Sequence, residues 1–148
     1  MVHVIIGALI VALDQASKLW IMMNFVEGES VQLLPYIYFT YVQNRGAAFG
    51  LLTNHQWLFV IIGLIAIFLA WYYRKLIRQQ NWLVRWGITL AIAGAVGNLI
   101  DRIRLGAVID FIDLTFFPVF NVADMAIVLG VAFLFVEVLI NDRQKSTS

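Results

Sequence analysis

Residues 108–124, V-I-D-F-I-D-L-T-F-F-P-V-F-N-V-A-D, place three carboxylates at the predicted start of a membrane-spanning helix: Asp110, Asp113 and Asp124. An Asp at the centre of such a helix costs about 2.5–3.5 kcal/mol on insertion scales, and less toward the interface. A residue kept at that cost is a functional candidate when a partner for it can be named. Two aspartates in one site of low dielectric constant can share a proton and act as general base and general acid on one water.

The composition is that of an integral membrane protein. The chain has 148 residues, of which 62% are hydrophobic and 13% charged, with a mean hydropathy of +0.87. Soluble domains have about 45–50% apolar and about 25% charged residues. The length fits a single domain over residues 1–148, and the net charge of +1 gives no indication of nucleic-acid binding. The absence of cysteine excludes disulfides, a thiol nucleophile and cysteine metal sites.

Four apolar segments are each close to the roughly 20 residues that cross a bilayer. We expect them at Val4–Met23, Trp57–Tyr73, Trp86–Ile103 and Asn121–Ile140. The first is not a cleavable signal peptide, because it lacks a basic n-region and its apolar run continues past Asp14. The loop between the second and third segments is rich in Lys and Arg and has no acid. The positive-inside rule therefore places this loop and both termini in the cytoplasm, and residues 24–56 and 104–120 outside.

With this orientation, most polar residues of the four segments converge on the outer leaflet. Glu137 is the exception, and we expect it to reach the cytoplasmic surface. Tyr36–Val42 is aromatic and β-branched and too short to span as a helix, so it predicts a strand. Asn44–Gly50, N-R-G-A-A-F-G, is typical of a turn. The predicted fold is an all-α membrane protein of four helices, with a small β element on the outer face between the first and second.

The polar residues of the first and third segments have structural as well as functional interpretations. Asp14 and Lys18 are four residues apart and can form an ion pair that eases insertion. Asn98 and Arg102 share a helix face, after an A-G-A-V-G run that allows close helix packing. Arg102 could brace a carboxylate by a bidentate contact or reach the headgroups. Asp101 is expected to be a solvated or paired interfacial charge.

The carboxylates of residues 108–124 also have alternatives. Asn121 is a good N-cap and Asp124 complements the helix dipole, so capping alone explains both residues. Asp110 and Asp113 both flank Phe111–Ile112 in an apolar context, and the sequence does not choose between them. His3 and His55 are isolated, and no His-rich or Cys-rich ligand spacing exists.

Five motifs occur in an order that resembles the lipoprotein signal peptidases (signal peptidase II) over nearly the whole chain. They are D-Q-A-S-K (Asp14–Lys18), N-R-G-A-A-F-G (Asn44–Gly50), G-A-V-G-N-L-I-D-R (Gly94–Arg102), V-I-D-F-I-D (Val108–Asp113) and F-N-V-A-D (Phe120–Asp124). Each motif alone is weak, but five in order on a four-span chain of this size are specific.

This resemblance implies an aspartyl endopeptidase of the bacterial cytoplasmic (inner) membrane, with an extracytoplasmic β-cradle in the region 36–50. Such enzymes cut the signal peptide from a prolipoprotein, just before a cysteine that carries a diacylglyceryl group. The resemblance makes Asp110 and Asp124 the catalytic pair and implies no metal or cofactor. The partners would be the lipidated substrate and membrane lipid, with no nucleic acid, and we expect a monomer. Residues matching positions that bind substrate or support the site are Asp14, Lys18, Asn44, Gly46, Asn98, Arg102 and Asn121.

Two other classes of protein are compatible with charges inside the membrane. A small transporter or proton-conducting channel would use them as a pathway, but a pathway needs polar groups through both leaflets. The second segment has no charge, and the inner halves of the others are nearly all apolar. A non-catalytic membrane assembly partner would use the charges only to pair its helices.

Overall fold

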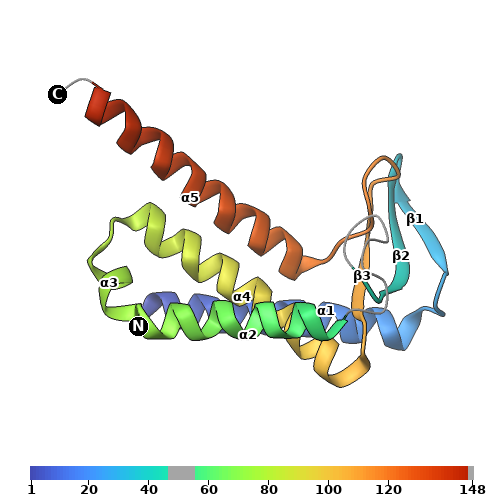
Figure 1. The fold of residues 1–148 in the computed structure, drawn as a ribbon. Helices are drawn as coiled ribbons and strands as arrows, with labels where there is room; N and C mark the ends of the chain where they lie inside the picture. The colour runs from blue at the N-terminus through green and yellow to red at the C-terminus, as the bar shows by residue number, and fades with distance from the viewer. Residues whose placement is uncertain (47–55, 147–148) are drawn as a thin grey trace.

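The computed structural model describes residues 1–46 and 56–146 and shows helices joined to a small sheet at one end (Figure 1). The predicted turn at Asn44–Gly50 lies partly outside the described residues, and His55 lies wholly outside them. In chain order the elements are α1 (Val2–Asn24), β1 (Ser30–Leu34), β2 (Ile37–Asn44), α2 (Gln56–Tyr72), α3 (Arg74–Gln79), α4 (Trp82–Leu105), β3 (Val108–Asp113) and α5 (Val122–Ser146).

In the described part of the chain, three helices are long and apolar enough to cross a membrane. They are α1, α4 and the part of α5 from Val122 to Asp142, whereas the apolar helix α2 has 17 residues in the described part of the chain. Helix α4 is central, because α1, α2 and α5 all pack against it. The predicted close packing at the A-G-A-V-G run is confirmed. A Cβ on Gly94 would clash with the carbonyl oxygen of Ala123 at the start of α5, so the two backbones touch.

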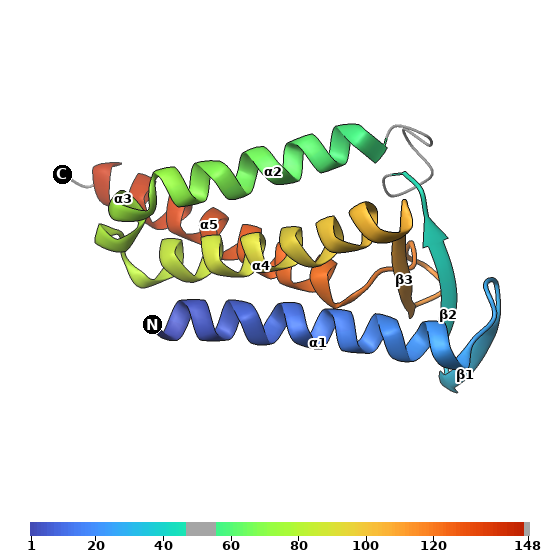
Figure 2. The ribbon, with the colours of Figure 1, turned by 90° about the horizontal axis from the view of Figure 1, so that it is seen from below.

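The sheet lies at one end of the helices, and both termini lie at the other (Figures 1 and 2). Its strands are antiparallel in the order β1-β2-β3. The strand expected within residues 36–42 is confirmed as β2, and β3 adds a strand that the sequence interpretation did not foresee. Ile109 and Phe111 of β3 pack with Ile21 and Tyr41 in a buried apolar cluster, which fixes the sheet to the end of α1.

The ends of α4 are set by local sequence. The side chain of Asn81 caps its first turn, accepting a hydrogen bond from the amide of Val84 at 3.1 Å. At the other end, Gly106 has φ of 70°, a conformation that favours glycine and lets the chain turn directly into β3. Near the Asn81 end, Glu137 accepts hydrogen bonds from Asn81 and Asn141. Glu137 is only 8% exposed, so it is buried against its neighbours, and its position at the cytoplasmic surface stays a prediction.

Candidate active site

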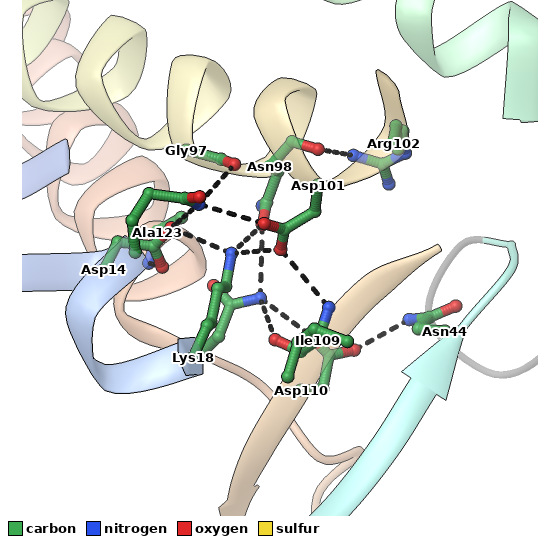
Figure 3. Close-up of polar contacts among 12 residues, drawn as sticks. Asp14, Lys18, Asn44, Gly97, Asn98, Asp101, Arg102, Ile109, Asp110 and Ala123 are labelled. Carbon is green, nitrogen blue, oxygen red and sulfur yellow. Dashed lines mark hydrogen bonds and ion pairs between the residues drawn. The ribbon is translucent and has the colours of Figure 1, made fainter. Parts of the chain in front are cut away.

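Asp110 enters the site from β3, and its carboxylate is held by two amides. Its Oδ1 accepts from Asn121 Nδ2 at 2.6 Å, and its Oδ2 accepts from Asn44 Nδ2 at 2.9 Å. The backbone amide of Gly46 donates to Asn44 Oδ1 at 3.0 Å. This bond turns the amino group of Asn44 toward Asp110 (Figure 3). The side chain of Asp110 is therefore fixed from both sides, and the residue is 2% exposed.

Asp124 enters the site from the first turn of α5 and takes part in a reciprocal cap. Its backbone amide donates to Asn121 Oδ1 at 2.9 Å, and its Oδ2 accepts from the backbone amide of Asn121 at 3.3 Å. This is a capping box with Asn and Asp in the two roles, and the capping prediction is confirmed. Capping does not use the other carboxylate oxygen, which accepts from Asn98 Nδ2 at 2.7 Å.

Asn121 and Asn98 connect the two carboxylates. Asn121 is fully buried and binds Asp110 through its amino group while its Oδ1 caps the amide of Asp124. Asn98 accepts from Lys18 Nζ at 3.0 Å and from Asn121 Nδ2 at 3.2 Å, so its amino group must face Asp124. Each amide has one acceptor and one donor group, and both groups are used.

Lys18, Asp14 and Asp101 form a buried ion cluster close to Asp110 (Figure 3). Lys18 Nζ lies 2.9 Å from Asp14 Oδ2 and 2.7 Å from Asp101 Oδ2, which confirms that Asp14 and Lys18 pair. The other oxygen of Asp14 accepts from the backbone amide of Ala123 at 2.9 Å. Asp101 accepts from the backbone amide of Ile109 at 3.3 Å. The cluster thus binds the backbone of Ala123, which precedes Asp124, and the backbone of Ile109, which precedes Asp110.

Asp110 and Asp124 line the same pocket, which has a volume of about 220 Å³. Asn44, Gly46, Asn98 and Arg102 also line it, and its apolar wall is formed largely by residues 117–120 and Val128. Burial is the main cause that raises the pKa of Asp110, to about 7, and the nearby charge of Asp124 raises it further. Hydrogen bonds from Asn44 and Asn121 and the charge of Lys18 oppose the rise. Asp110 can therefore hold a proton near neutral pH, which suits general acid–base chemistry on a water in the pocket.

Asp113 is not among the residues that line this pocket. Its Oδ2 accepts from Thr40 Oγ1 at 2.8 Å and its Oδ1 from the backbone amide of Thr115 at 2.8 Å. Strand geometry explains the separation, because side chains three residues apart in a strand point to opposite faces. The sequence could not use this argument, since β3 was not foreseen as a strand.

Arg102 lines the pocket without touching either carboxylate. Its Nη1 donates to the backbone oxygen of Asn98 at 3.4 Å, and its guanidinium carbon lies 5.0 Å from the centre of the Phe59 ring. Within residues 1–46 and 56–146, no carboxylate lies within ion-pair distance of Arg102, so the bidentate brace is absent from this structure. In the same residues, no three His, Asp or Glu side chains come together to hold a metal.

The comparison with protein families decides the class of the chain. The family model described as signal peptidase (SPase) II matches residues 6–140. The chain belongs to the signal peptidase II family. The lipoprotein signal peptidase of Clostridioides difficile (strain 630) is 44% identical to it over 142 residues, which are 94% of this chain and 95% of that protein. The lipoprotein signal peptidase of Pelotomaculum thermopropionicum is 44% identical over 146 residues, covering 97% of this chain and 94% of that protein.

Solved structures show the same fold. A bacterial membrane enzyme solved by the in meso method at 2.3 Å resolution has a TM-score of 0.91 and 34% identity, covering 97% of this chain and 91% of that one. A second bacterial membrane enzyme, solved by the same method at 1.9 Å, has a TM-score of 0.84 and 34% identity, covering 93% and 92% of the two chains. The resemblance drawn from the five motifs is thus confirmed, and the transporter alternative finds no support in these comparisons.

Two residues of this signal peptidase II site were missed or undervalued in the sequence. Gln15 Nε2 donates to Asp101 Oδ1 at 2.9 Å and to the backbone oxygen of Gly97 at 3.2 Å, so it links α1 to α4. Asp101 is a paired charge, as one interpretation had it, but it is 3% exposed and lies in the ion cluster. Both residues belong to motifs that were recognised, and the spacing of Asp14, Gln15 and Lys18 on α1 is the signal that could have included Gln15.

Proposed function

We propose that this signal peptidase II removes signal peptides from prolipoproteins, hydrolysing the bond before the diacylglyceryl-modified cysteine with Asp110 and Asp124 as its catalytic pair. The observation that supports this most directly is that the two carboxylates come from separate elements, β3 and α5, and line one pocket. Both residues are bound to the same side chain, Asn121. Family membership supplies the class of substrate, since the curated relatives are named lipoprotein signal peptidases.

In the proposed mechanism the pair holds one proton near neutral pH, because two carboxylates at one site of low dielectric constant do not both ionise. The ionised member takes a proton from water, and the water oxygen attacks the scissile carbonyl carbon. The protonated member donates to the carbonyl oxygen as it gains charge. When the C–N bond breaks, the member that took the proton from water gives it to the leaving amine. The other member takes back the proton on the former carbonyl oxygen, and the pair returns to its single-proton state.

We further propose that four helices cross the bacterial cytoplasmic membrane and that the sheet lies on its outer side. At about 1.5 Å per residue, the 17 described residues of α2 span about 26 Å, close to the roughly 30 Å of a hydrocarbon core. The sheet lies opposite both termini and the basic segment Arg74–Arg85, which the positive-inside rule assigns to the cytoplasm. The site then sits at the outer boundary, where acyl chains stay in lipid while the scissile bond meets polar groups.

The supporting residues have distinct roles in this proposal. Asn44 and Asn98 orient the two carboxylates, and Lys18 orients Asn98. Arg102 lines the pocket and forms no ion pair within residues 1–46 and 56–146, so its guanidinium is available to bind backbone carbonyls of the substrate. The sheet would act as a cradle for the segment that enters the pocket.

The test is cleavage of a diacylglyceryl-modified prolipoprotein by purified protein, with the unlipidated precursor as the control substrate. Asp110→Asn and Asp124→Asn should each abolish cleavage. Asp113→Asn should cleave at close to the normal rate, because its carboxylate lies outside the pocket. Gel-filtration profiles and melting temperatures identify any variant that fails to fold. Near-normal activity of a folded Asp110→Asn or Asp124→Asn variant would remove that residue from the pair.

A further inference from the structure

A second and larger pocket lies among the helices, and Met1 is one of the residues that line it. The N-terminus lies at the end of the helices opposite the sheet (Figure 2). Its volume of about 980 Å³ is at the upper end of the roughly 300–1,000 Å³ typical of small-molecule sites. Its walls come from α1, the last turn of α2, α3 and α4. The α1 and α4 walls are mainly small or aliphatic, including Gly7, Ala8, Val11, Ile88 and Ile92.

The same pocket has a strongly basic edge. Arg74, Arg78 and Arg85 all line it. Arg74 is held in place, since its Nη1 donates to the backbone oxygen of Trp71 at 2.9 Å and its guanidinium carbon lies 4.7 Å from the centre of that ring. In the described part of the chain, no carboxylate forms an ion pair with any of the three arginines. Three unpaired guanidinium groups beside an apolar cavity match a ligand with an anionic head and an apolar tail.

We propose that this pocket binds one anionic phospholipid of the leaflet opposite the catalytic pair. An acyl chain lies between α1 and α4, and the phosphate contacts Arg78 and Arg85. Basic pockets between transmembrane helices on the cytoplasmic side are suited to anionic headgroups. Because lipid chains fill any apolar groove in a bilayer, an acyl chain in the pocket would not be specific. The specific claim is that the arginines select an anionic headgroup.

Charge argues against the signal peptide as the occupant. A signal peptide carries a positively charged n-region before its apolar segment, and that region would meet three arginines of the same charge. A zwitterionic phospholipid offers a phosphate but also a cation, which the arginines repel. An anionic phospholipid satisfies both parts of the pocket.

The experiment is a titration of purified protein in a neutral detergent with dioleoyl phosphatidylglycerol or dioleoyl phosphatidylcholine, followed by native mass spectrometry. Wild-type protein should bind one phosphatidylglycerol at least about tenfold more tightly than phosphatidylcholine. Arg78→Gln/Arg85→Gln should weaken phosphatidylglycerol binding by roughly ten- to thirtyfold, the size expected for two arginines near an anionic headgroup. Arg78 is exposed, so Arg78→Gln alone serves if the double variant does not fold, with a smaller loss in the same direction.

Two controls match these variants. Lys75→Gln removes a neighbouring charge of α3 that does not line the pocket, and its affinity should stay within about threefold of wild type. Ala8→Trp fills the apolar part and should weaken binding of both lipids, whereas Ala16→Trp, at an exposed position of α1 outside the pocket, should not. Equal affinity of the wild type for the two lipids would overturn the proposal. So would an equal loss in Lys75→Gln, unchanged binding in Ala8→Trp, or stoichiometric displacement of the lipid by a signal peptide.

Discussion

Replacing Asp110 by Asn should change how the stability of the protein depends on pH. Asp110 is 2% exposed, and burial, with a smaller contribution from the charge of Asp124, raises its pKa from 3.8 to about 7. The folded protein therefore keeps this proton to about pH 7, while the unfolded chain releases it near 3.8. Between those values the folded state binds more protons, so the free energy of unfolding falls as the pH rises, and it levels off above about 7.

The size of this effect follows from the pKa itself. One pKa unit corresponds to about 1.36 kcal/mol, so Asp110 lowers the free energy of unfolding by up to about 4 kcal/mol between pH 4 and pH 8. For a chain of about 150 residues, this is a fall in melting temperature on the order of 10 °C. An asparagine side chain has no proton to lose here, so Asp110→Asn lacks this fall. The variant should be less stable than wild type at pH 4, by about 1–3 kcal/mol, because one oxygen replaces two as partner for Asn44 and Asn121.

The assay is thermal unfolding in detergent, followed by tryptophan fluorescence, for wild type, Asp110→Asn and Asp113→Asn at pH values from 4 to 8. Contributions of carboxylates that do not interact with Asp110 cancel in the differences between the curves. The melting temperature of Asp110→Asn, relative to wild type, should rise steadily up to about pH 7. Asp113→Asn is the control for loss of a carboxylate that does not line the pocket. A constant difference between Asp110→Asn and wild type over this range would refute the reasoning, since it would mean that Asp110 ionises at the same pH in both states.

Three further predictions concern activity and packing. The value of kcat/KM should fall about tenfold per pH unit above about 7, because ionisation of Asp110, whose pKa is about 7, leaves the pair without its proton; a profile flat to pH 9 would contradict this. Gly94→Ala should destabilise the protein by about 1–3 kcal/mol in thermal unfolding, since its Cβ would lie 2.7 Å from Ile127 Cγ1. Gly63→Ala should have almost no effect on stability, because its Cβ would contact only Leu99, at 3.7 Å. Lys18→Met should cost about 3–5 kcal/mol by leaving two buried carboxylates unpaired, against less than about 0.5 kcal/mol for Lys75→Met at the surface.

The helices, and the depth along them at which the site lies, could be predicted from the sequence because both depend on hydropathy. Apolar runs located the helices, and the positions of Asp14, Lys18, Asn98 and Asp124 within those runs indicated that they meet at one depth. The structure brings these residues together at one end of the helices. The resemblance to signal peptidase II then selected Asp110, which hydropathy could not do.

The remaining details depend on tertiary contacts that no local pattern shows. In β3, successive residues from Val108 to Phe111 are all buried, so the strand lacks the alternation of apolar and polar residues that marks an exposed-face strand. Without that strand, the opposite orientations of Asp110 and Asp113 could not be deduced. Asp101 was misjudged for a related reason. It stands close to two arginines in sequence, but its carboxylate accepts the amide of Ile109 in the buried start of β3.

The ion cluster explains why three charges persist inside an apolar bundle. Asp14 is bonded to the amide of Ala123, one residue before Asp124, and Asp101 is bonded to the amide of Ile109, one residue before Asp110. Lys18 joins the two. A buried ion pair is weak evidence for stability, because apolar residues of similar volume can do as well. This cluster, however, fixes the relative position of α5 and β3, the two elements that carry the proposed catalytic carboxylates. We therefore interpret the cluster as a device that holds two acidic side chains at one pocket. Its burial has an energetic cost, and its role is this positioning rather than a gain in folding stability.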